Sequence, residues 1–211
     1  NSGKNSGKNS GGGRHEFSAR GTRSPRRQKP IRIPDLAYLE RVAIWYLERY
    51  AASSAMLRRV LMRRVERAAR AQLIERELGQ SLVDQIITKC QALGYIHDQD
   101  FAGNLAGRLA RRGASQRQIE AALRARGLGA DDIAEAVTHA AREAEAKGEN
   151  PEFAAAQALA RRRHLGPYRT APFSDDPSER AKQRTRDFSV LARAGHSSAI
   201  ARQVLDHIPD D

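Results

Sequence analysis

No proline occurs between Pro34 and Pro151, and this long interval is rich in alanine, leucine and arginine. Proline removes a backbone donor and disrupts helix interiors, whereas these three residue types are strong helix formers. The interval contains no strand-length block in which β-branched or aromatic residues alternate with polar ones. The sequence therefore predicts an all-α protein with no sheet.

Residues that commonly cap helix N-termini divide the chain into segments. Ser81 with Asp84 and Ser115 with Gln118 have the spacing of a capping box. Two other capping residues, Asn150 and Asp176, directly precede a proline, which favours the first helical position. About nine helices are expected: 35–51, 54–78, 81–93, 98–112, 115–126, 131–147, 150–166, and a final pair that begins at 176 and is divided at Gly195.

One pattern of leucine and serine occurs three times without gaps, in Leu47–Leu61, Leu109–Leu123 and Leu191–Leu205. In each copy a serine follows the first leucine by six positions, and a leucine follows that serine by eight. Three copies indicate an internal repeat of a helical unit, and such units bury apolar faces against their neighbours. We expect tandem three-helix repeats in an elongated, curved array, at 35–95, 96–148 and 149–211, with a proline-containing loop near 165–177.

Lysine and arginine exceed aspartate and glutamate by 37 to 25, which gives a formal net charge of +12. Residues 1–34 contribute nine of the basic residues and one acid. Their Gly/Ser/Asn/Lys-rich start (1–13) and arginine- and proline-rich remainder predict a flexible basic tail, of which 1–13 resembles a linker. The positive charge favours a polyanionic partner, such as nucleic acid, a membrane surface or an acidic protein face.

The most concentrated positive charge lies in the segment that begins at Ser54. Four arginines spaced three or four positions apart predict a stripe along one side of a helix: Arg59, Arg63, Arg67 and Arg70. The opposite side is apolar and comprises Leu57, Leu61, Val65 and Ala68. A polyanion-facing surface and a plain solvated face both fit this pattern. The full predicted basic surface adds Arg58, Arg64, Arg111, Arg112, Arg117, Arg124, Arg161, Arg162 and Arg163.

Motifs for catalysis and metal binding are missing. The sequence contains no phosphate-binding P-loop and no Gly-x-Ser-x-Gly motif, and its single cysteine, Cys90, excludes zinc sites built from cysteine pairs. We therefore expect no catalytic residue, metal or cofactor.

Cys90 is expected to be buried and inert, His97–Asp100 to form a helix cap with a first-turn acid, and Trp45 and Tyr46 to pack in the core. No apolar run approaches the roughly 20 residues of a membrane span, so no membrane partner is expected.

Several stretches resemble the RecX family. "LGYIHDQDFA" (Leu93–Ala102) is similar to a family pattern with two adjacent acids, although His97 occupies the first acid's place. "RRGASQRQIEAALRARG" (Arg111–Gly127) resembles the stretch that follows it in the family. "YLERYAASSAMLRRVLMRRVERAAR" (Tyr46–Arg70) and "ALARRRHLGPYR" (Ala158–Arg169) look like a longer form found in some members. The resemblance extends from about Tyr38 to Leu205.

A cytoplasmic location is expected, because the single cysteine suits a reducing compartment and no secretory signal is visible. The resemblance implies a non-enzymatic regulator built from tandem three-helix repeats. Such a protein would bind the RecA recombinase filament on DNA and inhibit its extension, ATP hydrolysis, strand exchange and coprotease activity, thereby modulating recombinational repair and the SOS response. DNA, single- or double-stranded, is expected as a second partner of the basic surface, and the protein is expected to be a monomer. The main alternative is a helix-turn-helix DNA-binding repressor that reads DNA with Leu109–Arg126. A third interpretation is a structural helical adaptor with a solvated basic face.

Overall fold

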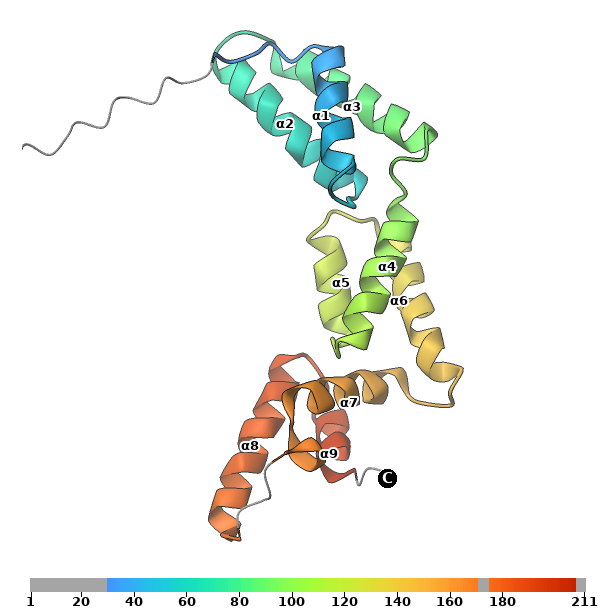
Figure 1. Ribbon diagram of the computed structural model, residues 1–211, viewed down its shortest axis with the longest axis vertical. Coiled ribbons are helices and arrows are strands. Elements are labelled where there is room, and N and C mark those ends of the chain that lie inside the picture. The colour runs from blue at the N-terminus through green and yellow to red at the C-terminus, as the bar shows by residue number, and fades with distance from the viewer. Residues whose placement is uncertain (1–29, 171–174, 208–211) are drawn as a thin grey trace, which may run out of the picture. The chain divides into compact units, whose positions relative to one another are not determined.

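The computed structural model describes residues 30–170 and 175–207, and this part of the chain forms nine α-helices and one short 3₁₀ helix without any strand. The predicted all-α fold is confirmed for these residues (Figure 1). Most of the predicted tail, 1–29, and part of the predicted proline-containing loop, 171–174, lie outside them. The elements are α1 (Leu36–Leu47), α2 (Ser54–Arg70), α3 (Arg76–Ala92), α4 (Asp98–Arg111), α5 (Gln116–Arg124), α6 (Ala130–Glu145), α7 (Pro151–Arg163), η1 (Gly166–Tyr168), α8 (Pro177–Arg193) and α9 (Ser198–Asp206).

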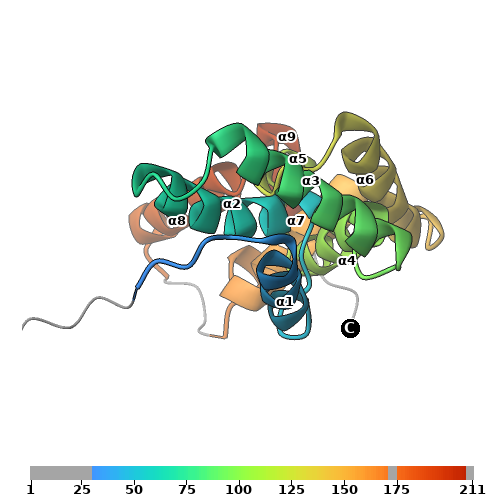
Figure 2. The ribbon, with the colours of Figure 1, turned by 90° about the horizontal axis from the view of Figure 1, so that it is seen from above.

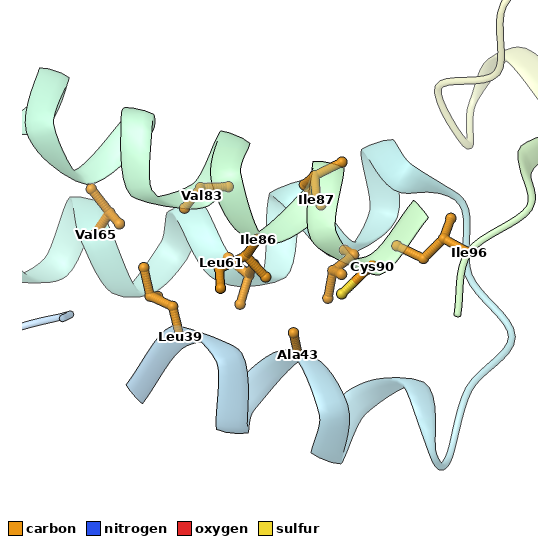
Figure 3. Packing of buried hydrophobic residues seen from close by; sticks show 10 residues of the cluster. Leu39, Ala43, Leu61, Val65, Val83, Ile86, Ile87, Cys90 and Ile96 are labelled. Atoms are coloured by element: carbon orange, nitrogen blue, oxygen red, sulfur yellow. The ribbon is translucent and has the colours of Figure 1, made fainter. Parts of the chain in front are cut away.

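Three clusters of buried apolar side chains divide the nine helices into three groups. In group 1, α1, α2 and α3 pack side by side around a core that includes Leu61 and Ile86 (Figures 1, 2 and 3). In group 2, α4, α5 and α6 pack around a core that includes Leu123. In group 3, α7, α8 and α9 pack with η1 around a core that includes Leu191 and Leu205. Each group thus has its own apolar core.

The three copies of the leucine-serine pattern have the same local structure. Their serines, Ser53, Ser115 and Ser197, are the N-caps of α2, α5 and α9, and each hydroxyl accepts a hydrogen bond of 3.2–3.3 Å from the backbone N–H three residues on. The leucines that follow are buried, since none is more than 8% exposed: Leu61, Leu123 and Leu205. The first two copies join the first and second helices of their groups, but the third joins α8 to α9. Group 3 therefore has α7 ahead of its copy, which accounts for the wider spacing between the second and third copies.

The predicted boundary between the second and third helices is wrong. The helix expected over 54–78 ends at Arg70, and Ser81 lies inside α3 instead of capping it. Gln72 adopts a left-handed backbone conformation with φ of 57°, and Leu73 N–H bonds back to the carbonyl of Ala68 at 3.1 Å. A left-handed residue cannot continue a right-handed helix, so the chain turns here and α3 begins at Arg76.

The aromatic pair on α1 is divided between core and surface. Tyr46 packs against the core of group 1, as predicted, but Trp45 is 50% exposed, so its predicted burial is wrong. The Arg49 guanidinium lies over the Trp45 ring at 4.5 Å from its centre, an arrangement favoured by the negative face of the indole. Helical geometry turns neighbouring positions by about 100°, so Trp45 points away from the direction in which Tyr46 meets the core.

Groups 2 and 3 meet at Gly113, which follows α4 with a φ of 80°. A Cβ atom at this position would lie 2.5 Å from the backbone nitrogen of Leu159 on α7, so only glycine allows this close approach. The imidazole Nε2 of His196, which is buried, donates to the Gly113 carbonyl oxygen at 3.1 Å. The turn of the second copy of the pattern is therefore a packed joint between two groups.

Candidate interaction surface

Helix α2 presents two chemically different sides. Its apolar side is buried in group 1 as the sequence predicted, with four residues at 0% exposure: Leu57, Leu61, Val65 and Ala68. On the other side, Arg63, Arg67 and Arg70 are exposed and have no hydrogen-bond or ion-pair partner among the described residues. Glu66, the single acid within α2, is instead paired with Arg76 at 2.8 Å. The three guanidiniums therefore form an unneutralised positive surface, which we call the α2 stripe.

The other arginines of α2 make contacts inside the chain. Arg58 forms an ion pair with Asp84 on α3. Arg64 donates to the carbonyl of Val60 at 2.8 Å. Arg59, predicted as part of the outward stripe, directs both terminal nitrogens to the carbonyl oxygen of Ala125 at 3.3 Å, just beyond the last residue of α5. A cation at a helix C-terminus is favourable because the carbonyl end carries partial negative charge.

The predicted arginines of group 2 fall into two environments. Arg124 pairs with Glu120 at 2.7 Å, and the hydrogen bonds from Gln116 and from Arg124 lower the pKa of the Glu120 carboxyl. Arg117 is exposed and adds a smaller electrostatic contribution to the same shift. Arg111, on α4, has an Nη1 atom 3.2 Å from the position that a Cβ of Gly107 would take, and Arg112 is exposed at the end of the helix. The positive charge of Arg124 is therefore partly neutralised within the helix.

The arginines at the end of α7 are all exposed. Arg161 lies over the ring of Tyr168, 5.3 Å from its centre. Arg162 and Arg163 line a pocket that they share with Arg112 and with Arg193 at the end of α8. The structure thus brings together residues from the predicted clusters at 111–112 and 161–163, and it adds an arginine that the predicted surface did not include.

The sequence contained a signal for this additional arginine. In the three-copy pattern, Arg193 occupies the position that Arg111 has in the second copy, two residues before a glycine that turns the chain. Both glycines, Gly113 and Gly195, have φ values of about 80°. Comparison of the copies position by position would therefore have added Arg193 to the predicted basic residues.

The segment His97–Asp100 does not form the predicted cap. His97 occupies the N-cap position of α4 without a side-chain hydrogen bond, and Asp98 is the first helical residue. The Asp98 carboxylate instead accepts a hydrogen bond of 2.7 Å from Ser54 N–H, at the first turn of α2. The acid therefore stabilises the start of a different helix and connects group 2 to group 1.

No protein-family model matches the chain. The regulatory protein RecX of Myxococcus xanthus (strain DK1622) is 37% identical over 198 residues, which cover 94% of this chain and 97% of that protein. The chain belongs to the RecX family. A crystal structure of regulatory protein RecX has a TM-score of 0.52 to this structure at 19% identity, covering 82% of this chain and 72% of the other. That second similarity supports the shared all-α fold.

Within this RecX-family chain, chemically reactive groups are sparse over the described residues. They contain no group of three or more histidine, cysteine, aspartate or glutamate side chains that could hold a metal ion. Cys90 is 4% exposed, as predicted, and burial raises the pKa of its thiol. No helix in the described ranges is both long and apolar enough to cross a lipid bilayer.

Proposed function

We propose that the chain is a non-enzymatic, monomeric and cytoplasmic regulator that binds the RecA recombinase filament on DNA. It inhibits filament extension, ATP hydrolysis, strand exchange and coprotease activity, and so modulates recombinational repair and the SOS response. It needs no cofactor. The α2 stripe is the observation that carries this proposal, because three exposed guanidiniums without acidic partners among the described residues suit a filament that contains DNA phosphates. Membership of the RecX family supports the same conclusion.

A helix-turn-helix repressor that reads DNA through α5 fits the structure less well. The N-terminal residues of a recognition helix contact base edges, so they have to face outward. At the start of α5, the Gln116 N–H donates to Glu152 on α7 at 2.9 Å, and the Gln116 side chain donates to Glu120 at 2.9 Å. Ser115 is 1% exposed. Contacts among the described residues therefore engage Ser115 and Gln116, and leave Arg117 and Gln118 as the exposed side chains without such a bond at this end of α5.

The decisive experiment measures ATP hydrolysis by RecA on single-stranded DNA with increasing amounts of the protein. The wild type should lower the rate in a dose-dependent manner. The double variant Arg63→Glu with Arg67→Glu should lose most of this inhibition, because two attractive charges become repulsive. A matched control, Arg41→Glu with Arg202→Glu, changes two exposed arginines outside the stripe and should retain it.

Circular dichroism would establish that both double variants remain helical. An unchanged ATPase rate with saturating wild-type protein would refute the proposed regulation of RecA. Full inhibition by the folded Arg63→Glu, Arg67→Glu variant would refute the role of the α2 stripe and favour the adaptor with a solvated basic face.

A further inference from the structure

A pocket of about 540 Å³ lies where three helices from two groups end. Helices α4, α7 and α8 have their C-terminal ends beside it, and four arginines line it: Arg112, Arg162, Arg163 and Arg193. The rest of the lining is apolar or uncharged, and includes Leu109, Leu159 and Gln118. No carboxylate of the described residues lines the pocket. The concentration of one sign of charge in one concave site makes the pocket attractive to anions.

The four arginines are not neutralised by other described side chains. Arg112, Arg162 and Arg163 have no hydrogen-bond or ion-pair partner in the described ranges. Arg193 donates from Nε to the backbone carbonyl of Ser189 at 3.1 Å, a bond that uses one of the five donors of its guanidinium. All four guanidiniums therefore retain donors for an external anion.

The helix ends account for only part of this charge. Each C-terminus carries roughly −0.5 of an elementary charge, so three ends contribute roughly −1.5 against four full positive charges. Stabilisation of helix ends alone would therefore leave roughly two and a half positive charges unbalanced. A bound anion with more than one negative charge would balance the site.

The lining of the pocket includes the joint between groups 2 and 3. Gly113 and Leu159, which approach each other closely across this joint, both line the pocket. Arg112 comes from group 2, whereas the other three arginines come from group 3. An anion held by arginines of both groups would therefore connect them across the joint.

We propose that this pocket binds backbone phosphates of a DNA strand and thereby holds groups 2 and 3 together. Arginine forms paired hydrogen bonds with phosphate oxygens, and the pocket volume falls within the roughly 300–1,000 Å³ of typical ligand sites, larger than a single phosphate requires. A DNA strand presents several phosphates in succession, so it can engage guanidiniums that come from three different helix ends. The site is independent of the proposed action on RecA and can be tested with DNA alone.

The test measures binding of a short fluorescein-labelled oligothymidylate to the full chain by anisotropy over a range of salt concentrations. The double variant Arg162→Gln with Arg193→Gln should weaken binding by about tenfold or more. The slope of the logarithm of the association constant against the logarithm of the salt concentration should also become less steep, by about 0.7 for each phosphate that the variant no longer binds. The matched control Arg186→Gln with Arg202→Gln removes two exposed arginines outside the pocket, one of them also on α8, and should change binding by less than about threefold.

Two further measurements make the outcome decisive. DNA should raise the melting temperature of the wild type more than that of the pocket variant, because only the intact pocket lets bound DNA add a connection between the two groups. Circular dichroism should confirm that the variant is folded, and Arg112→Gln with Arg163→Gln would replace it if it is not. Equally weakened binding in the pocket variant and the control would overturn the proposal, as would unchanged binding in the pocket variant. A competition experiment adds millimolar inorganic phosphate or ATP to the complex with oligothymidylate. If these compounds displace the DNA from the wild type but not from the pocket variant, the pocket binds free phosphate compounds and the assignment to DNA is overturned.

Discussion

The Ser53 hydroxyl donates a hydrogen bond of 2.7 Å to the backbone carbonyl oxygen of Arg126, 73 residues further along the chain. The same hydroxyl oxygen also accepts from Met56 N–H and so caps α2. Beside this pair, a Cβ added to Gly127 would lie 2.4 Å from the Cβ of Ala55. One side chain therefore both starts a helix and connects group 1 to group 2.

Replacement of Ser53 by alanine should cost more stability than the same change at Ser197. Loss of an N-cap costs about 1 kcal/mol in either case. The Ser53 variant also leaves the Arg126 carbonyl without its partner at a site where the serine is 0% exposed, which adds about 1–3 kcal/mol. Urea unfolding of both variants would measure the difference, and equal reductions in stability would show that the hydrogen bond to Arg126 contributes nothing.

Replacement of Gly113 by alanine should weaken the joint between groups 2 and 3. Gly148 provides a matched control, because both glycines have positive φ values, 80° and 72°, but a Cβ at Gly148 meets nothing within 4 Å. Backbone strain of about 1–2 kcal/mol applies to both variants. The clash with Leu159 should add about 1–3 kcal/mol for Gly113→Ala alone. Thermal unfolding would compare them, and similar melting temperatures would contradict the close packing seen here.

Arg59 and Arg63 are adjacent positions of the predicted stripe, but they should support different properties. Loss of Arg59 should mainly lower stability, whereas loss of Arg63 should mainly lower inhibition of RecA. Arg59→Ala removes the bonds to the Ala125 carbonyl and should cost up to about 1 kcal/mol of unfolding free energy. Arg63→Ala should leave stability nearly unchanged, because its side chain has no partner among the described residues. In the RecA ATPase assay, Arg63→Ala should reduce inhibition more than Arg59→Ala does. The reverse order would indicate that Arg59 leaves Ala125 when the partner binds.

Cys90 should react slowly with a thiol reagent such as dithionitrobenzoate. Burial raises the pKa of its thiol, so at pH 8 the fraction of reactive thiolate is smaller than for an exposed cysteine, and the side chain is only 4% exposed. The rate should rise sharply with urea concentration, in parallel with unfolding measured by circular dichroism. Rapid modification of the folded chain would contradict the packing of group 1.

Acid should weaken the interaction between α8 and α9. The hydrogen bond from Arg184 lowers the pKa of the Asp206 carboxyl, so the carboxylate stabilises the folded state above the ordinary value of about 3.9. This contribution disappears as the pH falls through the lower pKa of the folded state. Asp206→Asn should therefore show a smaller decrease of unfolding free energy between pH 5 and pH 2 than the wild type.

The control for this pH series is Glu149→Gln, which alters an exposed acid without an ion-pair partner among the described residues. Its acid sensitivity should equal that of the wild type. A wild-type pH dependence in Asp206→Asn would show that the ion pair with Arg184 does not couple to folding.

Most helices could be predicted because their signals are local. The capping serines Ser115 and Ser197, and the Asn150-Pro151 pair, act through hydrogen bonds to N–H groups two or three residues away. The apolar side of α2 could be predicted for the same reason, since its period is that of the helix itself. The end of α2 could not, because Gln72 carries no sequence signal for a left-handed conformation comparable to that of glycine.

The candidate sites also have features that the sequence predicts and features that only the folded structure shows. The all-α fold, the repeated helical unit and the basic character of the surface could be predicted from the sequence alone, since they depend on residue type and short spacing. Three relationships emerged only from the folded chain: Arg59 contacts Ala125, Asp98 accepts a hydrogen bond from Ser54 N–H at the start of α2, and Arg193 joins Arg112 and Arg162 in one pocket. Each of them joins residues far apart in the chain, and the packing of whole helices, which no local hydrogen bond or period specifies, brings them together.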